Sequence, residues 1–81
     1  MKVQVKFFAA ARQLAGSPAV ELELPALVTV ADVRAAVAAR FPALAEIDRH
    51  LVFAVNAAYA SEQTLIPEQA EVACIPPVSG G

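Results

Sequence analysis

The residues best suited to chemistry stand at the end of the sequence, which reads Pro76-Pro77-Val78-Ser79-Gly80-Gly81. The two prolines fix φ and remove two backbone donors, so this segment cannot continue a sheet and instead forms a stiff spacer. The two glycines lack a Cβ and make the tip thin and deformable. At ~3.3 Å per extended residue, the segment carries the carboxylate of Gly81 up to ~20 Å from the preceding residues. These properties predict a flexible tail, residues 76–81, that threads a reactive carboxylate into the narrow active site of another protein.

A second interpretation of this ending gives it no function. Chain ends often fray and collect glycine, and the remnant of an expression vector has the same appearance. The position of the glycine pair favours a chemical role, because a Pro-Pro spacer separates it from a strand-like run and no polar tag sequence intervenes. The elements that precede the tail must decide between the two interpretations.

Composition and charge restrict the classes of function. Eighty-one residues make one domain, and 58% of them are hydrophobic. The formal net charge of −2 provides no basic patch, so nucleic acid is not an expected partner. The single cysteine cannot form an internal disulfide, which favours a cytoplasmic protein. No apolar run approaches the ~20 residues of a membrane span and no signal-peptide pattern opens the sequence, so no membrane association is expected.

Alternating apolar residues predict the strands. Val3, Val5 and Phe7 share one face of the first strand, and three apolar residues of the second strand do the same. A short helical turn at 9–15, stopped by Gly16, makes the connection between these two strands a wide one. The expected strands are residues 2–8, 19–24, 51–55 and 71–75, with a very short one near 56–60.

Helical spacing predicts one main helix. Thr29 is the expected N-cap, and Asp32 lies near the positive end of the helix dipole. Arg34 and Arg40 are expected on the solvent side, Pro42 ends the helix, and a weak helical turn is expected at 44–47. The expected apolar stripe consists of Val30, Val33, Val37 and Phe41.

This order of elements predicts an α+β roll. A mixed sheet of four or five strands carries one main helix on one face, within a domain of residues 1–75. The other face of the sheet is left to water or to a partner. By alternation, Phe8 and Ile75 lie on this uncovered face, close to the start of the tail. Two apolar side chains on neighbouring strands there predict a partner-binding surface.

Other candidates for chemistry have simpler explanations. Cys74 could relay sulfur, but alternation turns it inward, where free cysteine commonly packs as a small apolar residue. His50 has no cysteine or second histidine at ligand spacing, so no metal site is expected. Glu68 and Glu71 are expected to be solvated charges of a turn.

The sequence resembles the small-subunit family of molybdopterin synthase over its whole length. The resemblance rests on Phe7-Phe8-Ala9, Arg12, the Val-x-x-Val helix, Val55-Asn56, Glu71-Val72 and, most specifically, the Pro-Pro-Val-Ser-Gly-Gly ending. It implies a β-grasp, ubiquitin-like fold, which agrees with the order of elements. It also implies a protein that is not an enzyme on its own and binds no cofactor.

The chemistry implied by this resemblance concerns Gly81. A ubiquitin-activating-like adenylyltransferase uses ATP to adenylate the Gly81 carboxylate, and a sulfur donor enzyme then provides the sulfur that displaces AMP. The resulting thiocarboxylate donates sulfur for the dithiolene of molybdopterin, within a heterotetramer that contains a large catalytic subunit. Gly80, Ser79, Val78, Pro77 and Pro76 are the residues that thread the partner's channel.

Three classes of function therefore stay open. The first is a sulfur carrier, either for molybdenum cofactor biosynthesis or for another pathway such as thiamine or sulfur-containing amino acids. The second is a ubiquitin-like modifier that is attached to lysines, since its chemistry is the same up to the adenylate. The third is a β-grasp binding module with an incidental Gly-Gly end.

Overall fold

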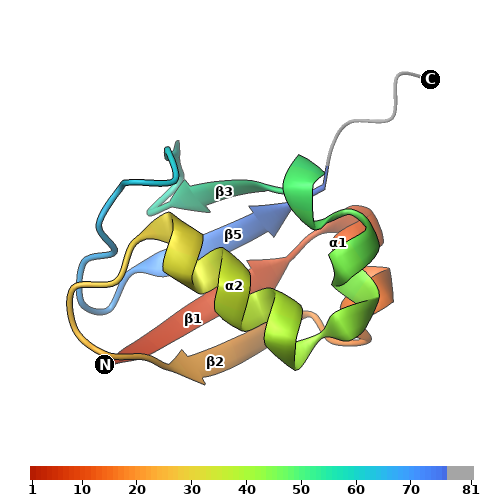
Figure 1. Ribbon diagram of the computed structural model, residues 1–81, viewed down its shortest axis with the longest axis horizontal. Helices are drawn as coiled ribbons and strands as arrows, with labels where there is room; N and C mark the ends of the chain where they lie inside the picture. The colour runs from red at the N-terminus through yellow and green to blue at the C-terminus, as the bar shows by residue number, and fades with distance from the viewer. Residues whose placement is uncertain (77–81) are drawn as a thin grey trace.

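A computed structural model describes residues 1–76, and the predicted tail residues Pro77, Val78, Ser79, Gly80 and Gly81 lie outside the described part of the chain. The described elements are, in order, β1 (Lys2–Phe7), α1 (Ala9–Ala15), β2 (Ala19–Glu23), α2 (Val30–Arg40), the 3₁₀ helices η1 (Pro42–Glu46) and η2 (Asp48–His50), β3 (Val52–Val55), β4 (Ala58–Tyr59) and β5 (Glu71–Ile75). Figure 1 shows α2 lying across the strands, with β5 running toward the C-terminus.

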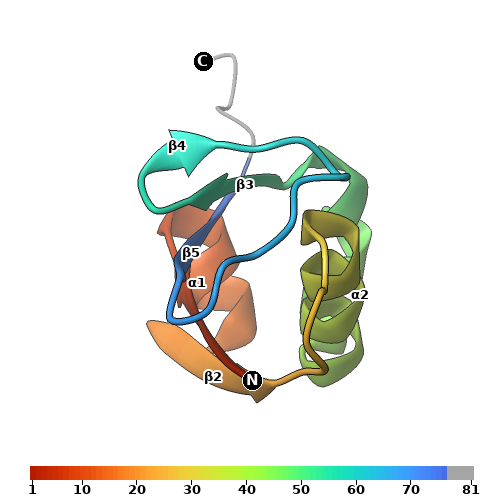
Figure 2. The ribbon, with the colours of Figure 1, turned by 90° about the vertical axis from the view of Figure 1, so that its left-hand side faces the viewer.

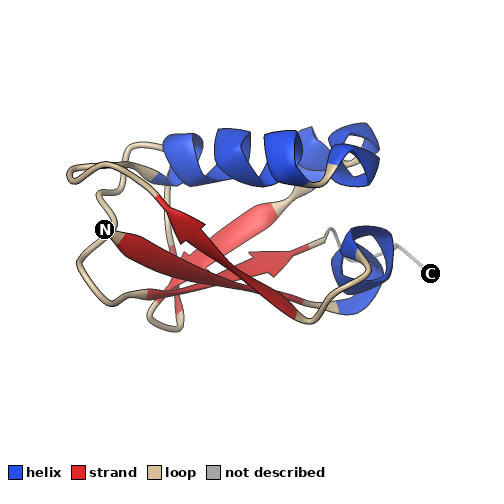
Figure 3. Cartoon of the chain, turned by 90° about the horizontal axis from the view of Figure 1, so that it is seen from below, coloured by secondary structure: helices blue, strands red, loops and turns tan. Residues whose placement is uncertain are grey.

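Residues 1–76 form one mixed sheet of five strands in the order β2-β1-β5-β3-β4. The central pair, β1 and β5, is parallel, and each of the other neighbouring pairs is antiparallel. Helix α2 covers one face of this sheet, while α1 lies at the end where β1 finishes (Figures 2 and 3). The predicted α+β roll with one main helix on one face is therefore confirmed.

The core fills the space between the sheet and α2. Val3, Val5 and Phe7 of β1 are buried, and so are Val72 and Cys74 of β5, as the alternation predicts. The same alternation sends the intervening residues of both strands to the face that α2 does not cover. The sheet therefore has one apolar face under α2 and a second face that is open.

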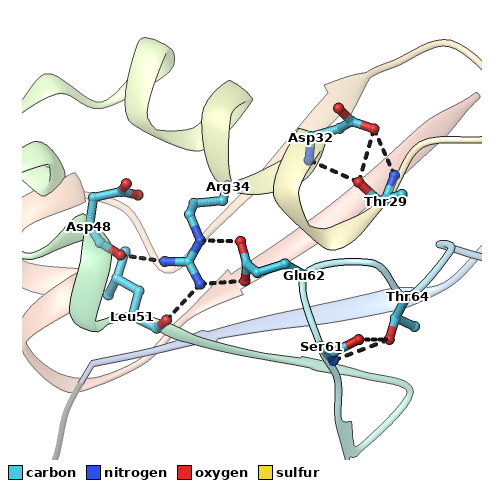
Figure 4. A network of polar contacts seen from close by, with 8 residues as sticks. All are labelled: Thr29, Asp32, Arg34, Asp48, Leu51, Ser61, Glu62 and Thr64. Carbon is cyan, nitrogen blue, oxygen red and sulfur yellow. Dashed lines mark hydrogen bonds and ion pairs between the residues drawn. The ribbon is translucent and has the colours of Figure 1, made fainter.

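Helix α2 begins as the sequence predicts. Thr29 and Asp32 form a capping box, in which the Asp32 carboxylate accepts from the Thr29 backbone N–H at 2.8 Å and the Thr29 hydroxyl accepts from the Asp32 N–H at 3.4 Å (Figure 4). Val30, Val33 and Val37 are buried against the sheet. Phe41, the last predicted member of the apolar stripe, is half-buried and is the C-cap of the helix.

The connection after β1 is more regular than expected. Residues 9–15 make a two-turn helix rather than a single turn, and Gly16 ends it in the left-handed conformation with φ 71°. Its N–H donates to the carbonyl oxygen of Arg12 at 3.0 Å, as a helix C-cap requires. The weak turn expected at 44–47 is also more extensive, because η1 and η2 together occupy most of 42–50.

The prediction that Arg34 faces solvent is wrong. Its side chain is only 17% exposed, and its guanidinium pairs with both carboxylate oxygens of Glu62, at 2.9 and 2.8 Å. The same group donates to the carbonyl oxygens of Asp48 and Leu51 (Figure 4). It also lies over the ring of Phe53, 4.9 Å from the ring centroid. Arg34 thus joins α2 to η2, to the start of β3 and to the loop after β4. We call these contacts the Arg34 network.

Candidate functional site

The base of the tail is held firmly by the sheet. β5 is a central strand, paired with β1 on one side and with β3 on the other, and it ends at Ile75. Pro76, the next residue, is buried. The spacer predicted from the sequence therefore starts at a fixed point on the domain. The other predicted tail residues, including Gly81, lie outside the described residues.

The structure brings Phe8 and Ile75 together. The backbone N–H of Phe8 donates to the carbonyl oxygen of Cys74 at 3.2 Å, so the end of β1 is bonded to the end of β5. Both side chains line a hollow of about 360 Å³ on the face that α2 leaves open. We call this hollow the apolar groove; its walls are Phe8, Ala54, Ala57, Tyr59, Ala73 and Ile75.

Strand register explains why the surface is hollow at this place. Ala54 of β3 is opposite Tyr59 of β4 on one side and opposite Ala73 of β5 on the other. Two alanines in the middle of the sheet leave a depression, while the larger side chains of Phe8 and Tyr59 stand at its rim with exposed fractions of 47% and 78%. The arrangement suits the insertion of an apolar side chain from another protein.

Sequence reasoning did not find Tyr59. The residue belongs to a strand of only two residues, whose alternation is too short to assign a face. The signal that could have found it is the tight turn before it. Asn56 and Ala57 have φ values of 49° and 69°, so β3 and β4 form a hairpin, and this hairpin places Tyr59 beside β3.

The rest of the open face is charged. Lys6 of β1 pairs with Glu71 of β5 at 3.2 Å, and Lys2 lies 3.9 Å from Glu21 of β2. These exposed pairs stabilise the fold little, typically by less than ~1 kcal/mol each. These pairs lie in the polar part of the open face, over β1 and β2. The apolar part of the same face lies over β3, β4 and the end of β5.

The weaker candidates have structural explanations. Cys74 is fully buried, and burial raises the pKa of its thiol to about 11, so the thiolate needed for sulfur chemistry is disfavoured at neutral pH. His50 is exposed in η2, where its ring accepts from the Arg49 side chain at 3.3 Å. In residues 1–76, no three acidic, histidine or cysteine side chains come together as a metal site requires. Nor does any helix of this part of the chain have the length and apolarity needed to cross a bilayer.

Comparisons with known sequences cover the whole chain. A family model described as the ThiS family matches residues 5–81. The molybdopterin synthase sulfur carrier subunit of Arabidopsis thaliana is 33% identical over 81 residues, which span 100% of this chain and 84% of the plant protein. The protein of the same name from Drosophila yakuba is 38% identical over 84 residues, which span 100% of this chain and 92% of the fly protein.

Comparisons with solved structures confirm the predicted β-grasp fold. SAMP1 from Haloferax volcanii, a small archaeal modifier protein, has a TM-score of 0.88 at 29% identity, with all of both chains covered. A putative molybdopterin converting factor subunit 1 from Pyrococcus furiosus has a TM-score of 0.86 at 34% identity, over 96% of this chain and 99% of that one. A chain from a complex of subunits 1 and 2 of the molybdopterin-converting factor from Helicobacter pylori has a TM-score of 0.71 at 21% identity, with both chains fully covered, and shows the fold alone.

The matches agree with the described geometry, in which a β-grasp domain holds the base of a Pro-Pro spacer beside an apolar groove. The chain therefore belongs to the ThiS family, and its relatives include the molybdopterin synthase sulfur carrier subunits.

Proposed function

We propose that this chain carries sulfur as a thiocarboxylate on Gly81 and donates it for the dithiolene of molybdopterin. The observation that supports this most strongly is the joining of two features at one end of the sheet: an apolar groove of about 360 Å³ and the fixed start of a tail that ends in Gly80-Gly81. A carrier needs both, because its partner must hold the domain while the tip reaches the reacting atoms.

The proposed loading of Gly81 takes two steps. A carboxylate oxygen of Gly81 attacks the α-phosphorus of ATP, pyrophosphate leaves, and an acyl-adenylate forms. Sulfide supplied by a donor enzyme then adds to the carbonyl carbon, AMP departs with the former carboxylate oxygen, and the thiocarboxylate of Gly81 remains. Adenylation is needed because a free carboxylate is negatively charged and resonance-stabilised, and so resists nucleophiles. Basic groups of the partner enzymes stabilise the developing charges.

The proposed partner for sulfur transfer is the large catalytic subunit of molybdopterin synthase, which docks on the apolar groove and accepts the tail. The Helicobacter pylori structure is named as a complex of subunits 1 and 2 of the converting factor. The other proposed partners are an adenylyltransferase and a sulfur donor enzyme. The proposed assembly with the large subunit is a heterotetramer, and the proposed compartment is the cytoplasm.

Intact mass spectrometry tests the loading step. The purified chain is incubated with an adenylyltransferase of this pathway, ATP and sulfide, and replacement of one oxygen by sulfur adds about 16 Da. A Cys74→Ala variant should gain the same mass, because the proposed sulfur is on Gly81. A chain with one residue added after Gly81 should gain nothing. Loading of the extended chain, or loss of loading in Cys74→Ala, would contradict the proposal.

A second candidate is attachment of the chain to lysines of other proteins. It is favoured by the full-length match to SAMP1, at 29% identity and a TM-score of 0.88. The chemistry diverges only at the adenylate, which an amine attacks in place of sulfur. Peptide mass spectrometry of the expressing cells distinguishes the two, because conjugation joins the Gly81 carboxyl group to a lysine of another protein. Since Arg49 is the last arginine or lysine of the chain, trypsin leaves residues 50–81 attached to that lysine.

A further inference from the structure

The apolar groove has a neighbour on the other side of Phe8. A second hollow, of about 300 Å³, opens between the end of β1, the start of α1 and the start of β2. Its walls include Lys6, Phe8, Arg12 and Pro18. Since Phe8 lines both hollows, a protein surface that fills the apolar groove and passes over Phe8 reaches the second one.

Two cationic side chains, Lys6 and Arg12, line the second hollow, and they differ in whether an ion pair already neutralises them. Lys6 is already neutralised by Glu71 at 3.2 Å. Arg12 is exposed, and no ion pair within residues 1–76 includes it. Its guanidinium is therefore the charge in this hollow that is available to an incoming anion.

The backbone fixes Arg12 relative to Phe8. The Arg12 N–H donates to the Phe8 carbonyl oxygen at 3.3 Å, and the Arg12 carbonyl oxygen accepts from Gly16 at 3.0 Å. Phe8 is the N-cap of α1 and has an extended backbone, and the side chains of Phe8 and Arg12 both line the second hollow. A partner that covers this hollow therefore meets both the ring of Phe8 and the guanidinium of Arg12.

We propose that the partner presents a carboxylate beside the apolar side chain that enters the apolar groove, and that this carboxylate binds Arg12 in the second hollow. This inference rests on the docking surface of the proposed function and adds the chemistry of the partner. A carboxylate fits because guanidinium binds it in two parallel hydrogen bonds. With a net charge of −2 the chain as a whole does not attract acidic proteins, so Arg12 acts locally and selects the partner's orientation.

Titration calorimetry against the purified large subunit of molybdopterin synthase tests this pairing with five variants of the full chain. At low salt, Arg12→Gln should weaken binding roughly two- to fivefold, the range expected of a single exposed ion pair. Arg12→Glu should weaken it at least about tenfold, because two carboxylates would then face each other. Arg12→Lys should keep part of the affinity. The loss in Arg12→Gln should shrink at high salt, where the pair is screened.

Arg40→Glu is the matched control. It makes the same charge change at an exposed residue of α2, on the other side of the sheet, and should bind as the parent does. Equal weakening by Arg40→Glu and Arg12→Glu would overturn the inference, since the effect would then come from net charge. Phe8→Ala separates the two proposals. If it weakens binding while Arg12→Glu does not, only the carboxylate is wrong; if Phe8→Ala binds unchanged, the docking surface itself is wrong.

Discussion

Phe8 and Cys74 are joined by a hydrogen bond of 3.2 Å from the N–H of the first to the carbonyl oxygen of the second. Phe8 presents an exposed ring to the open face, and Cys74 lies two positions before Pro76, the first proline of the tail. The docking surface and the start of the tail are therefore parts of one rigid unit. A partner that binds the ring of Phe8 also fixes the point at which the tail starts.

The first prediction concerns the two apolar residues of the open face. Phe8→Glu and Ile75→Lys should weaken binding to the large subunit strongly while leaving the isolated domain nearly as stable. Each side chain is partly exposed to solvent in the free domain, so the free energy of unfolding should change by no more than about 0.5 kcal/mol. In the complex each new charge would be buried without a partner, at a cost of several kcal/mol. Thermal melting and titration measure the two effects separately.

Val72→Lys is the control for this assignment of faces. Val72 is fully buried under α2, so the same lysine should unfold the domain there. Binding of Ile75→Lys as tight as that of the parent, or melting as low as that of Val72→Lys, would show that the two faces of β5 have been assigned wrongly.

The second prediction concerns the tip of the tail. One residue added after Gly81 should abolish sulfur transfer without changing the melting temperature, because the reactive group is the terminal carboxylate itself. Gly80→Val should also fold normally but transfer slowly, since a β-branched side chain widens and stiffens the segment that enters the partner. Complementation of a strain that lacks its own carrier measures both. Growth supported by the extended chain without processing would contradict this prediction.

The third prediction concerns the reactivity of Cys74. Its buried thiol has a pKa raised to about 11, so iodoacetamide at pH 8 should label the folded chain far more slowly than the chain in denaturant. The raised pKa also determines how the stability of the fold depends on pH. The neutral thiol is favoured in the fold, so its contribution to stability is complete below the ordinary thiol pKa and is lost as pH rises toward 11. Equal labelling rates with and without denaturant would show that Cys74 is accessible.

The fourth prediction concerns the Arg34 network. The hydrogen bonds from Arg34 lower the pKa of Glu62, so the pair stabilises the fold above the ordinary carboxylate pKa and loses this effect as pH falls through the lowered value. Glu62→Gln should therefore lower the melting temperature at pH 7, and the difference from the parent should shrink in acid. The Glu62 side chain is 46% exposed, so the loss should stay below about 1 kcal/mol.

Glu68→Gln makes the same change at an exposed carboxylate that has no ion pair within the described residues. Its melting temperature should follow that of the parent at every pH. A pH-independent difference for Glu62→Gln would show that its effect comes from packing rather than from charge.

Local signals explain which parts of this molecule could be predicted from the sequence. Alternation is a property of neighbouring residues, and the bounds of β5 and the inward side of Val72 and Cys74 follow from it. The capping box of α2 is equally local, because its two residues are three positions apart. The partners of Arg34 are not local. Glu62 is 28 residues away, and the other acceptors are backbone carbonyls, so no spacing in the sequence indicates that this arginine is largely buried.

The site shows the same division. Phe8 and Ile75 could be assigned to the open face because each extends a clear alternating run. The groove between them could not be predicted, because it depends on the register that sets Ala54 opposite both Tyr59 and Ala73. The position of Arg12 beside Phe8 depends on how α1 follows β1, with Phe8 as its extended N-cap, whereas the sequence indicated only a helical turn.

The strand order has a consequence for how the chain folds. β5, the last strand in sequence, lies between β1 and β3, and in residues 1–76 it is the strand that joins the β2-β1 pair to the β3-β4 pair. Without β5, these are two separate hairpin-like pairs, each too small to be stable alone. The sheet therefore closes late, by contacts between distant parts of the sequence, which slows folding. A chain truncated before Glu71 should remain unfolded and open to proteolysis, so the cell would not accumulate folded carriers that lack the strand holding the tail.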